Sequence, residues 1–341
     1  MAERNITIAD IAREAGVSKT TASFYMNGKS KMYNLADSTC ARIEDVIKKH
    51  NFSPNIHAKA INSGRTYLIG VVVGNISQSF WTDIISGIET AIEKYQYHML
   101  LTVSHHSRER EEKLLEFLDK KGVDGYIYSP VVTDAGIPNL SFALKLAEKK
   151  PMIAITYPVE GMPVVYNDNY LGGRIAAEYL FGKGHVKVAS MIGSHLHRRQ
   201  KGFIDYYKEH GIDVALFNTL DAFLNHAQEF TGMFCFSDYN LLELYDKAKN
   251  AGIKIPRDLS VIGYDNMDFI KFVNPSPATI HQYKNEIGFQ AGKLLMEIIN
   301  GENHVSEDIR FEPKLIEGKS VSKIKTDYLQ TSKQTKQEIK K

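Results

Sequence analysis

The first 50 residues place apolar positions at helical spacing in three short segments. Thr7 and Asp10 have the spacing of a capping box, which predicts the start of the first helix, and Gly16 would end that helix. Ser18 is a suitable N-cap for a second helix over residues 19–26. The tight turn between them lets the two helices cross closely, as a helix-turn-helix requires.

The second predicted helix has two different faces. Ala22, Tyr25 and Met26 can point inward, while the other face is polar and is basic near its start at Lys19. A third helix over residues 37–50 would complete a three-helix core. The polar face suits a recognition helix that enters the major groove of DNA, although an ordinary surface helix would show the same pattern.

From residue 67 to about residue 282, apolar runs of strand length alternate with helical patterns, which predicts parallel sheets flanked by helices. The predicted strands cover residues 67–73, 98–104, 124–130, 151–157, 187–193, 232–238 and 259–265. The helix after the first of these strands carries an apolar stripe of helical period, which we expect to be core rather than a cofactor site. The stripe consists of Trp81, Ile84, Ile85, Ile88, Ala91, Ile92 and Tyr95.

Charge is segregated along the 341-residue chain, although the net charge is only +2. Residues 1–65 carry ten Lys/Arg and six Asp/Glu, residues 66–318 carry 25 and 32, and residues 319–341 carry seven and two. A basic N-terminal module beside an acidic body suits a protein whose first domain meets a polyanion.

A hydrophobic fraction of 43 % permits a substantial core. The chain has no apolar run long enough to cross a membrane and no apolar signal-peptide segment near its start, so we expect a cytoplasmic protein without a membrane partner. Cys40 and Cys235 lie far apart in different contexts and are expected to be reduced.

A short segment joins the basic module to the alternating region. Pro54 would end the third helix and Asn55 is a good N-cap, but residues 56–63 make barely two helical turns. A helix of that length is too short to be stable alone in water and needs a partner.

At this point the residues resemble the LacI/GalR (lactose-repressor) family of transcription regulators. The segments "TIADIAREAGVSKTTAS", "SPNIHAKAINSGRT" and "IGVVVGNISQSFW" have the order and spacing of that family. The resemblance implies an all-α helix-turn-helix DNA-binding domain followed by an α/β effector domain of two periplasmic-binding-protein-like subdomains. It also implies a homodimer on palindromic double-stranded operator DNA, in which paired hinge helices fold against the minor groove and Ile61 opens the central base step as an apolar wedge.

The resemblance implies a domain order as well. The expected domains are a DNA-binding domain over 1–53, a hinge over 54–66, an N-subdomain over 67–163 plus 283–312 and a C-subdomain over 164–282 plus 313–320. Residues 321–341 are polar, and Leu329 and Ile339 form no heptad, so we expect a disordered tail without a tetramerising coiled coil.

Two departures from the common family pattern are similar to the fructose and sucrose regulators. Phe24 stands where most members carry arginine, and the loop after the second helix is longer. Because an aromatic ring cannot form a bidentate contact to guanine, we expect it to contact a thymine methyl group or to pack inward. Lys19 and Thr20 are expected to read base edges, and the polar residues around them to bind phosphate. The predicted DNA-binding residues are Thr7, Ser18, Lys19, Thr20, Thr21, Ser23, Phe24, Asn27, Lys29, Lys31, Tyr33, Asn55, His57, Ala58 and Ile61.

Ligands of open parallel sheets bind at the carboxyl ends of the strands, where this chain places polar side chains. The predicted effector-binding residues are Asn75, Ser77, Phe80, Thr156, Tyr157, Arg199, Ser237, Asp238, Asp265 and Gln282. By resemblance, Arg199 matches the family arginine that grips sugar hydroxyls or an anionic effector, and Asp265 matches the acid that accepts from hydroxyls. Thr156 stands where many relatives have aspartate, which weakens a neutral-pyranose interpretation. The stretch between residues 211 and 233 is shorter than is usual in the family and lacks a loop that commonly places an aromatic ring against the ligand. Phe223 is a candidate to replace that ring.

The segment "GSHLHRRQK", residues 193–201, holds a His-x-His pair and three basic residues. No cysteine or carboxylate cluster accompanies the pair, so we expect no metal; the basic residues suit a phosphate or carboxylate of the effector, or simply a solvated loop. The sequence has no phosphate-binding loop, nucleophile elbow, zinc-protease motif or dinucleotide fingerprint, so neither an enzyme nor a cofactor is predicted.

The sequence therefore predicts a dimeric repressor of carbohydrate-utilisation genes that a sugar or sugar phosphate controls through the hinge helices. Two alternatives stay open. One is a cytoplasmic two-lobed sugar-binding protein or sugar-modifying enzyme, against which the first 65 residues speak. The other is a regulator that answers to a protein corepressor or a nucleoside.

Overall fold

The computed structural model describes residues 6–26, 28–52, 64–132, 140–192, 198–302 and 308–324. They belong to two compact units, Met1–Tyr67 and Leu68–Lys341, and each unit is described by itself.

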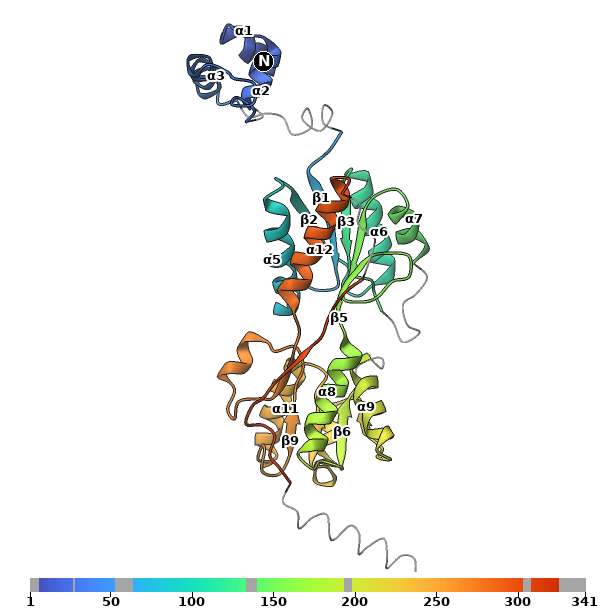
Figure 1. Cartoon of the computed structure of the whole chain (residues 1–341). Coiled ribbons are helices and arrows are strands. Elements are labelled where there is room, and N and C mark those ends of the chain that lie inside the picture. The colour runs from blue at the N-terminus through green and yellow to red at the C-terminus, as the bar shows by residue number, and fades with distance from the viewer. Residues whose placement is uncertain are drawn as a thin grey trace, which may run out of the picture. The chain divides into compact units, whose positions relative to one another are not determined.

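The described residues of the first unit, which we call the N-terminal unit, include three helices (Figure 1): α1 Ile8–Glu14, α2 Lys19–Met26 and α3 Asp37–Lys49. The predicted capping box is present, because Thr7 accepts from the Asp10 amide and the Asp10 carboxylate accepts from the Thr7 amide. The core consists of Ile11, Ala15, Ile43 and Val46, with Ile6, Val17, Tyr25, Met26, Ile47 and Phe52 packed against it. The predicted three-helix core is confirmed.

The second unit has two lobes, each built on a parallel sheet between helices (Figure 1). The N-lobe sheet has six strands in the order β11-β5-β4-β3-β1-β2, and every neighbouring pair is parallel. The N-lobe elements are β1 Leu68–Val73, α5 Ser79–Glu93, β2 His98–Val103, α6 Arg108–Lys120, β3 Gly125–Tyr128, α7 Ser141–Ala147, β4 Met152–Ile155, β5 Val164–Asn167, α12 Lys284–Ile299 and β11 Ile309–Phe311.

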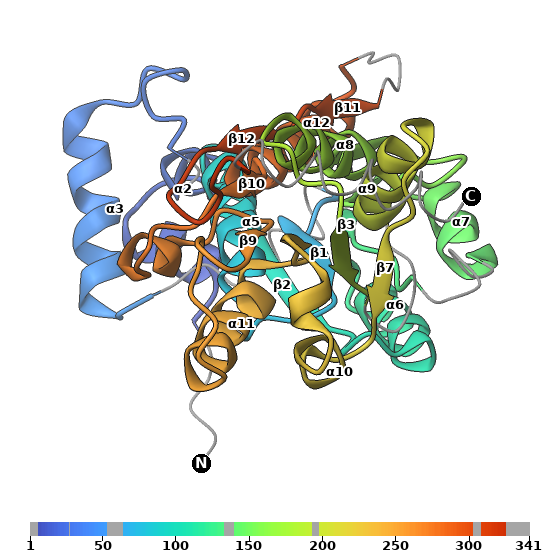
Figure 2. The same ribbon diagram turned by 90° about the horizontal axis from the view of Figure 1, so that it is seen from below.

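The C-lobe contains a parallel four-stranded sheet, in the order β7-β6-β8-β9, and a small antiparallel sheet of β10 and β12. Its elements are α8 Asn169–Gly182, β6 Val188–Met191, α9 Arg198–Glu209, β7 Ala215–Phe217, α10 Leu220–Leu224, η1 Ala227–Glu229, β8 Gly232–Phe234, α11 Asp238–Asn250, β9 Ser260–Ile262, η2 Asp268–Phe272, β10 Thr279–His281 and β12 Lys314–Ile316. Figure 2 shows α8 and α9 on one side of this sheet and α10 and α11 on the other. The predicted α/β architecture with two parallel sheets is confirmed.

Each lobe contains one pair of helices that cross backbone to backbone. In the N-lobe, a Cβ atom on Gly288 of α12 would overlap the carbonyl oxygen of Ile84 of α5. In the C-lobe, a Cβ atom on Gly173 of α8 would overlap the carbonyl oxygen of Arg199 of α9. Glycine is required at both crossings because no side chain fits between the two backbones.

The apolar stripe after the first strand lies in α5 as predicted, except for Tyr95, which follows the helix end at Glu93. Trp81, Ile84, Ile88, Ala91 and Ile92 are buried there, so the stripe is core. Ile85 and Tyr95, which also belong to the stripe, are only half-buried. Along the described residues, no helix combines the length and apolar composition that a membrane crossing requires.

Three segments connect the lobes: β5 to α8, β10 to α12 and β11 to β12 (Figure 1). The first crossover between the lobes was expected near residue 163, but it lies one strand later in the chain. β5 still belongs to the N-lobe sheet, where it pairs with β4 and β11. Val164 and Val165 are buried at that place, so the chain leaves the N-lobe only after Asn167.

The expectation of a disordered tail from residue 321 is wrong for its first four residues. Val321 packs into the C-lobe core, and the Ser322 amide donates to the Ser260 hydroxyl at 3.0 Å. The Ile324 amide donates to the Lys183 carbonyl at 2.9 Å. Burial and main-chain bonds therefore hold residues 321–324 against the C-lobe; the rest of the predicted tail, with Leu329 and Ile339, lies outside the described residues.

Candidate functional site

The outer face of α2 carries a lysine and two threonines in the first turn of the helix. Lys19 and Thr20 are exposed, whereas Thr21 and Ser23 are half-buried. Ser18 acts as the predicted N-cap, because its Oγ accepts from the Thr21 amide at 3.0 Å and lies 2.8 Å from the Thr21 hydroxyl. The Thr21 hydroxyl therefore helps to form the cap, while Lys19 and Thr20 extend into solvent.

Phe24 packs on the loop that follows α2. Its ring stacks on the Tyr33 ring with 3.6 Å between centroids and an interplanar angle of 2°. Main-chain bonds fold the loop beneath this stack, since Lys29 N donates to Phe24 O at 2.9 Å and Tyr33 N donates to Lys29 O at 3.1 Å. Phe24 therefore packs on the loop, and its expected contact with a thymine methyl group stays a prediction. Lys29, Lys31 and Tyr33 are exposed beside the end of α2.

The remaining predicted nucleic-acid contacts differ in how far the structure describes them. Thr7 is exposed, but its side chain is engaged in the capping box of α1. Five predicted contacts lie outside the described residues: Asn27, Asn55, His57, Ala58 and Ile61.

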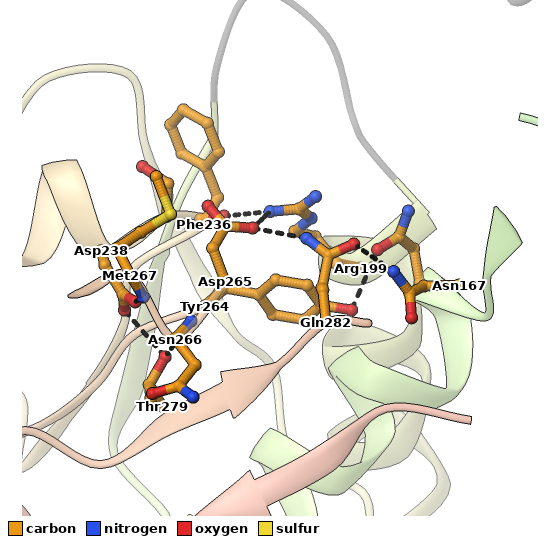
Figure 3. Close-up of polar contacts among 12 residues, drawn as sticks. Asn167, Arg199, Phe236, Asp238, Tyr264, Asp265, Asn266, Met267, Thr279 and Gln282 are labelled. Atoms are coloured by element: carbon orange, nitrogen blue, oxygen red, sulfur yellow. Dashed lines mark hydrogen bonds and ion pairs between the residues drawn. The ribbon is translucent and has the colours of Figure 1, made fainter. Parts of the chain in front are cut away.

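A polar network lies where the strands of the C-lobe end, at the segments that connect the lobes (Figure 3). Arg199 donates through Nη1 to Asp265 Oδ1 at 3.2 Å and to the Phe236 carbonyl at 2.6 Å. Gln282 donates through Nε2 to the same Asp265 oxygen, and Asn167 donates through Nδ2 to Gln282 Oε1 at 3.1 Å. Three residues predicted from distant parts of the sequence, Arg199, Asp265 and Gln282, are thus in direct contact.

Each member of the network is fixed by its element. Arg199 lies in the first turn of α9, and its guanidinium carbon lies 4.0 Å from the centroid of the Tyr264 ring, in cation–π geometry. Asp265 follows β9 with a φ of 105°, in a region that L residues rarely adopt. Burial raises the pKa of Asp265, and the Arg199 charge acts in the opposite direction. The pair can present a cation and a carboxylate to the hydroxyls or the anionic group of a ligand.

The N-lobe contributes a second group of predicted residues. Thr156 follows β4 with a φ of 70°, and its hydroxyl lies 3.0 Å from the Ser129 hydroxyl. Asn75 Oδ1 accepts from both the amide and the hydroxyl of Ser77, each at 2.9 Å, so these two residues form a closed turn. Phe80 contacts Trp81 edge to face with 5.2 Å between ring centroids.

Tyr157 follows β4 in the N-lobe and is affected by charges of the C-lobe. Burial raises the pKa of its hydroxyl, and the charges of Arg199 and Arg198 act in the opposite direction. The Tyr157 hydroxyl of the N-lobe therefore lies within electrostatic reach of the arginine of the C-lobe network. The predicted residues occupy both sides of the boundary between the lobes.

Two expected contacts require correction because their side chains are buried beneath the surface. Asp238 is 0 % exposed, and its carboxylate accepts from Met267 N and from the Thr279 hydroxyl, each at 2.8 Å. A residue without exposed atoms cannot touch a ligand, so Asp238 supports the turn after Asp265. Phe223 is likewise 0 % exposed and packs against Phe217 and Phe230.

Ser237 serves a structural role that its sequence position did not reveal. Its hydroxyl is the N-cap of α11, donating to Asn240 Oδ1 at 2.9 Å and accepting from Asn240 N at 3.3 Å. Ser237 is half-buried, so part of its surface still faces solvent at this strand end.

The buried carboxylate of Asp238 predicts a pH dependence of stability. Burial raises its pKa to about 7, above the value of 3.8 for an exposed aspartate. The folded state therefore holds this proton more tightly than the unfolded state, so the stability contribution is complete below pH ~4 and is lost as the pH rises through ~7. Between pH 5 and pH 8, the free energy of unfolding of the parent should fall by about 2.5 kcal/mol relative to that of Asp238→Asn, measured by urea titration at each pH. A difference that stays constant over this range would contradict the assignment.

Two important residues were not predicted. Asn167 joins the network from the end of β5, and its Oδ1 also accepts from the Tyr283 amide at 3.2 Å. Lys284 is buried at the start of α12 and donates to the carbonyls of Asp265 and Asn266. The helical spacing of Lys284 with buried Ile287, Gly288 and Ala291 was a signal for its burial.

The His-x-His pair of residues 193–201 lies outside the described residues, and only Arg198 onward is described in that segment. Among the residues with described positions, no group of three or more His, Cys, Asp or Glu side chains is arranged to hold a metal ion.

Comparisons with known proteins agree with the two units. Residues 7–55 match the model for bacterial regulatory proteins of the lacI family, and residues 177–321 match a periplasmic binding protein-like domain. An HTH-type transcriptional repressor PurR from Photobacterium profundum is 29 % identical over 336 residues, which is 92 % of this chain and 98 % of the relative.

Two solved structures extend the comparison. A periplasmic binding protein/LacI transcriptional regulator from Alkaliphilus metalliredigens, complexed with D-xylulofuranose, is 27 % identical, has a TM-score of 0.64 and covers 75 % of this chain and 99 % of its own. The lac repressor dimer bound to operator and the anti-inducer ONPF is 20 % identical, with a TM-score of 0.81 over 94 % of this chain and 100 % of its own. At that identity the second comparison shows the fold.

Proposed function

The chain belongs to the LacI family of bacterial regulatory proteins and is a DNA-binding transcription regulator, and from that premise we propose that it is a homodimeric repressor controlled by a sugar or sugar phosphate. The Arg199–Asp265–Gln282 network carries the proposal, because it offers charged donors and acceptors where the two lobes meet. A ligand bound there would contact both lobes and change their relative orientation. We propose a binding protein without a catalytic step, acting on DNA in the cytoplasm.

The carbohydrate class is supported by the chemistry of the network. Asp265 can accept from hydroxyls and Arg199 can donate to hydroxyls or to a phosphate. The relative complexed with D-xylulofuranose binds a sugar. The likeness of the loop after α2 to the fructose and sucrose regulators stays a prediction about the branch.

A homodimer is supported by an exposed apolar surface on the C-lobe. Phe272 in η2 is 82 % exposed and Leu242 in α11 is 41 % exposed. Leu242 also lines a surface hollow, together with Tyr245, Asp246, Lys249, Gly252, Ile253, Lys254, Ile255, Asn274 and Pro275. Large exposed apolar side chains beside a hollow mark an interface, and a second copy of the chain is the occupant that a palindromic site requires.

The repressor proposal is tested on duplex DNA that contains an intergenic palindrome from the region next to the gene. In a gel-shift titration, the parent should bind this duplex and Ile61→Gly should bind at least about tenfold more weakly, because glycine would remove the proposed wedge and disfavour the proposed hinge helix. Both proteins should be dimers by analytical ultracentrifugation. Equal binding of the two proteins, or a monomer indifferent to DNA sequence, would overturn the proposal.

The effector class is tested separately by thermal shift. Sucrose, fructose, their phosphates and D-xylulose form one arm, and nucleosides form the other. A rise in Tm with a sugar or sugar phosphate supports the carbohydrate assignment, since a ligand stabilises the state that it binds. A rise with nucleosides alone would replace it, and no rise in either arm would favour a protein corepressor.

The Phe24–Tyr33 stack gives a further expected result. Tyr33→Ala should weaken operator binding by about five- to tenfold, because loss of an aromatic pair of about 1 kcal/mol loosens the loop that presents Lys29 and Lys31. Fluorescence anisotropy with the labelled duplex measures the effect. Tyr33→Phe keeps the ring and Met32→Ala alters the 73 % exposed neighbour, so both controls should bind as the parent does. A Tyr33→Phe protein as weak as Tyr33→Ala would assign the effect to the hydroxyl.

A further inference from the structure

Lys284 is a buried lysine in the part of the chain that the structure describes. It begins α12, which packs in the N-lobe, and its side chain is 7 % exposed. A buried ammonium group is stable only when its hydrogen-bond donors find acceptors. The partners of Lys284 therefore show what it holds together.

The ammonium group donates out of the N-lobe into the C-lobe. Lys284 Nζ lies 2.8 Å from the Asp265 carbonyl oxygen and 3.2 Å from the Asn266 carbonyl oxygen. Its third neighbour belongs to the N-lobe again, since Asp83 Oδ2 of α5 lies 3.7 Å from Nζ. One ammonium group thus connects α5, α12 and the turn that carries Asp265.

The turn that Lys284 holds is strained. Asn266 has a φ of 49°, which asparagine adopts readily, but Asp265 has a φ of 105°, and such a conformation persists only where surrounding contacts fix it. The Asp265 side chain meets Arg199 and Gln282, while the carbonyls of Asp265 and Asn266 accept from Lys284. A movement of Asp265 on the effector side therefore acts directly on Lys284.

The N-lobe end of this connection is rigid. Helices α5 and α12 cross so closely that a Cβ atom on Gly87 would overlap the Asn285 carbonyl oxygen, and one on Gly288 would overlap that of Ile84. Asn285 Nδ2 also donates to the Asp83 carbonyl at 3.3 Å. Because the two backbones are in contact, we expect the α5–α12 pair to move as one body and to pass a displacement of Lys284 to the N-lobe.

We infer that Lys284 is a positioning residue that holds the Asp265 turn against Asp83 and transmits effector occupancy from the C-lobe to the N-lobe. The inference rests on the proposed effector cleft for its regulatory meaning. Lys284 need not touch the effector. The ammonium couples the two lobes because it has partners in both, and the coupling is lost when either partner is lost.

Hydrogen exchange of the full-length protein without any effector tests the connection. Lys284→Met keeps the length of the side chain and removes its charge, so amide exchange at Asp265 and Met267 should rise about tenfold as the charged hydrogen bonds disappear. Asp83→Asn should raise exchange at the same amides, although Asp83 lies in the other lobe. A purely local role of Lys284 would not produce the second effect. Lys293→Met is the matched control, since Lys293 lies on the same helix and pairs only with Glu297 among the described residues.

The regulatory arm uses D-xylulose and fructose 1-phosphate as probes in the operator titration. If a probe changes the affinity of the parent for operator, the ratio of affinities with and without the probe should be at least about fivefold smaller in Lys284→Met and in Asp83→Asn. The probe itself should still bind to both variants. If neither probe changes the operator affinity of the parent, the thermal-shift screen decides the effector class and the exchange result decides the role of Lys284. Unchanged exchange at Asp265 and Met267 in Asp83→Asn, or full regulation in Lys284→Met, would overturn the inference.

Discussion

Replacing Arg199 by methionine is expected to reduce effector affinity by at least about 100-fold, because methionine keeps the apolar stem and removes every donor. It should also destabilise the second unit by about 3 kcal/mol. Asp265 is only 7 % exposed, and without Arg199 it would be a buried charge that has lost its ion-pair partner. Isothermal titration with fructose, sucrose and their phosphates measures the first effect, and urea unfolding measures the second.

The neighbouring arginine supplies the control. Arg198 is exposed at the start of the same helix, so Arg198→Met should leave stability unchanged and affinity within a few-fold of the parent. The double variant Arg199→Met/Asp265→Asn should regain stability without regaining affinity, because it removes both charges together. An Arg199→Met protein that binds as tightly as Arg198→Met would remove Arg199 from the site.

The second large effect concerns the crossing of α8 and α9. Gly173→Ala should destabilise the second unit by about 2 kcal/mol, because the added methyl group would overlap the Arg199 carbonyl oxygen and lie too close to the Phe203 amide nitrogen. The crossing is reciprocal, since a Cβ atom on Gly202 would overlap the Tyr170 carbonyl oxygen. The two helices must separate to admit the methyl group, and α9 carries Arg199 away from Asp265. Differential scanning calorimetry should show a fall in Tm of about 5 °C.

Gly182→Ala is the matched substitution on the same helix. Nothing lies within 4 Å of a Cβ atom at Gly182, so the helix propensity of alanine should leave Tm unchanged or slightly higher. Equal losses of Tm in both variants would mean that the crossing does not require glycine.

The parallel sheets could be predicted from the sequence because strands that are covered on both faces appear as continuous apolar runs. The seven predicted strands of this kind are all present. The prediction missed β5, β7 and β11 of the parallel sheets and the antiparallel pair β10 and β12. These strands are only three or four residues long, and β10 and β12 pair across a large separation in sequence, as in Thr279 with Ile316. Their existence depends on a partner strand rather than on a local pattern.

The site was predictable to the extent that it follows strand ends. Arg199, Asp265 and Gln282 were identified in this way and are in contact. Asp238 occupies an equivalent sequence position, but its carboxylate points beneath the turn, where a Cβ atom on Gly263 would overlap it. Whether the Asp238 carboxylate is buried depends on tertiary packing, which cannot be derived from the local sequence pattern. Lys284 was missed for a similar reason, because its partners are carbonyls of a strained turn far away in the chain.

The late position of α12 in the chain has a consequence during synthesis. This helix covers β3, where a Cβ atom on Gly125 would meet Leu295 and Ile299, yet it follows the complete main sheet of the C-lobe in chain order. A nascent chain that has made β1 to β4 must therefore keep one apolar sheet face uncovered while the C-lobe is translated. Slow codons or a ribosome stall before residue 284 would prolong that exposure, and chaperone capture and aggregation of the newborn protein should increase accordingly.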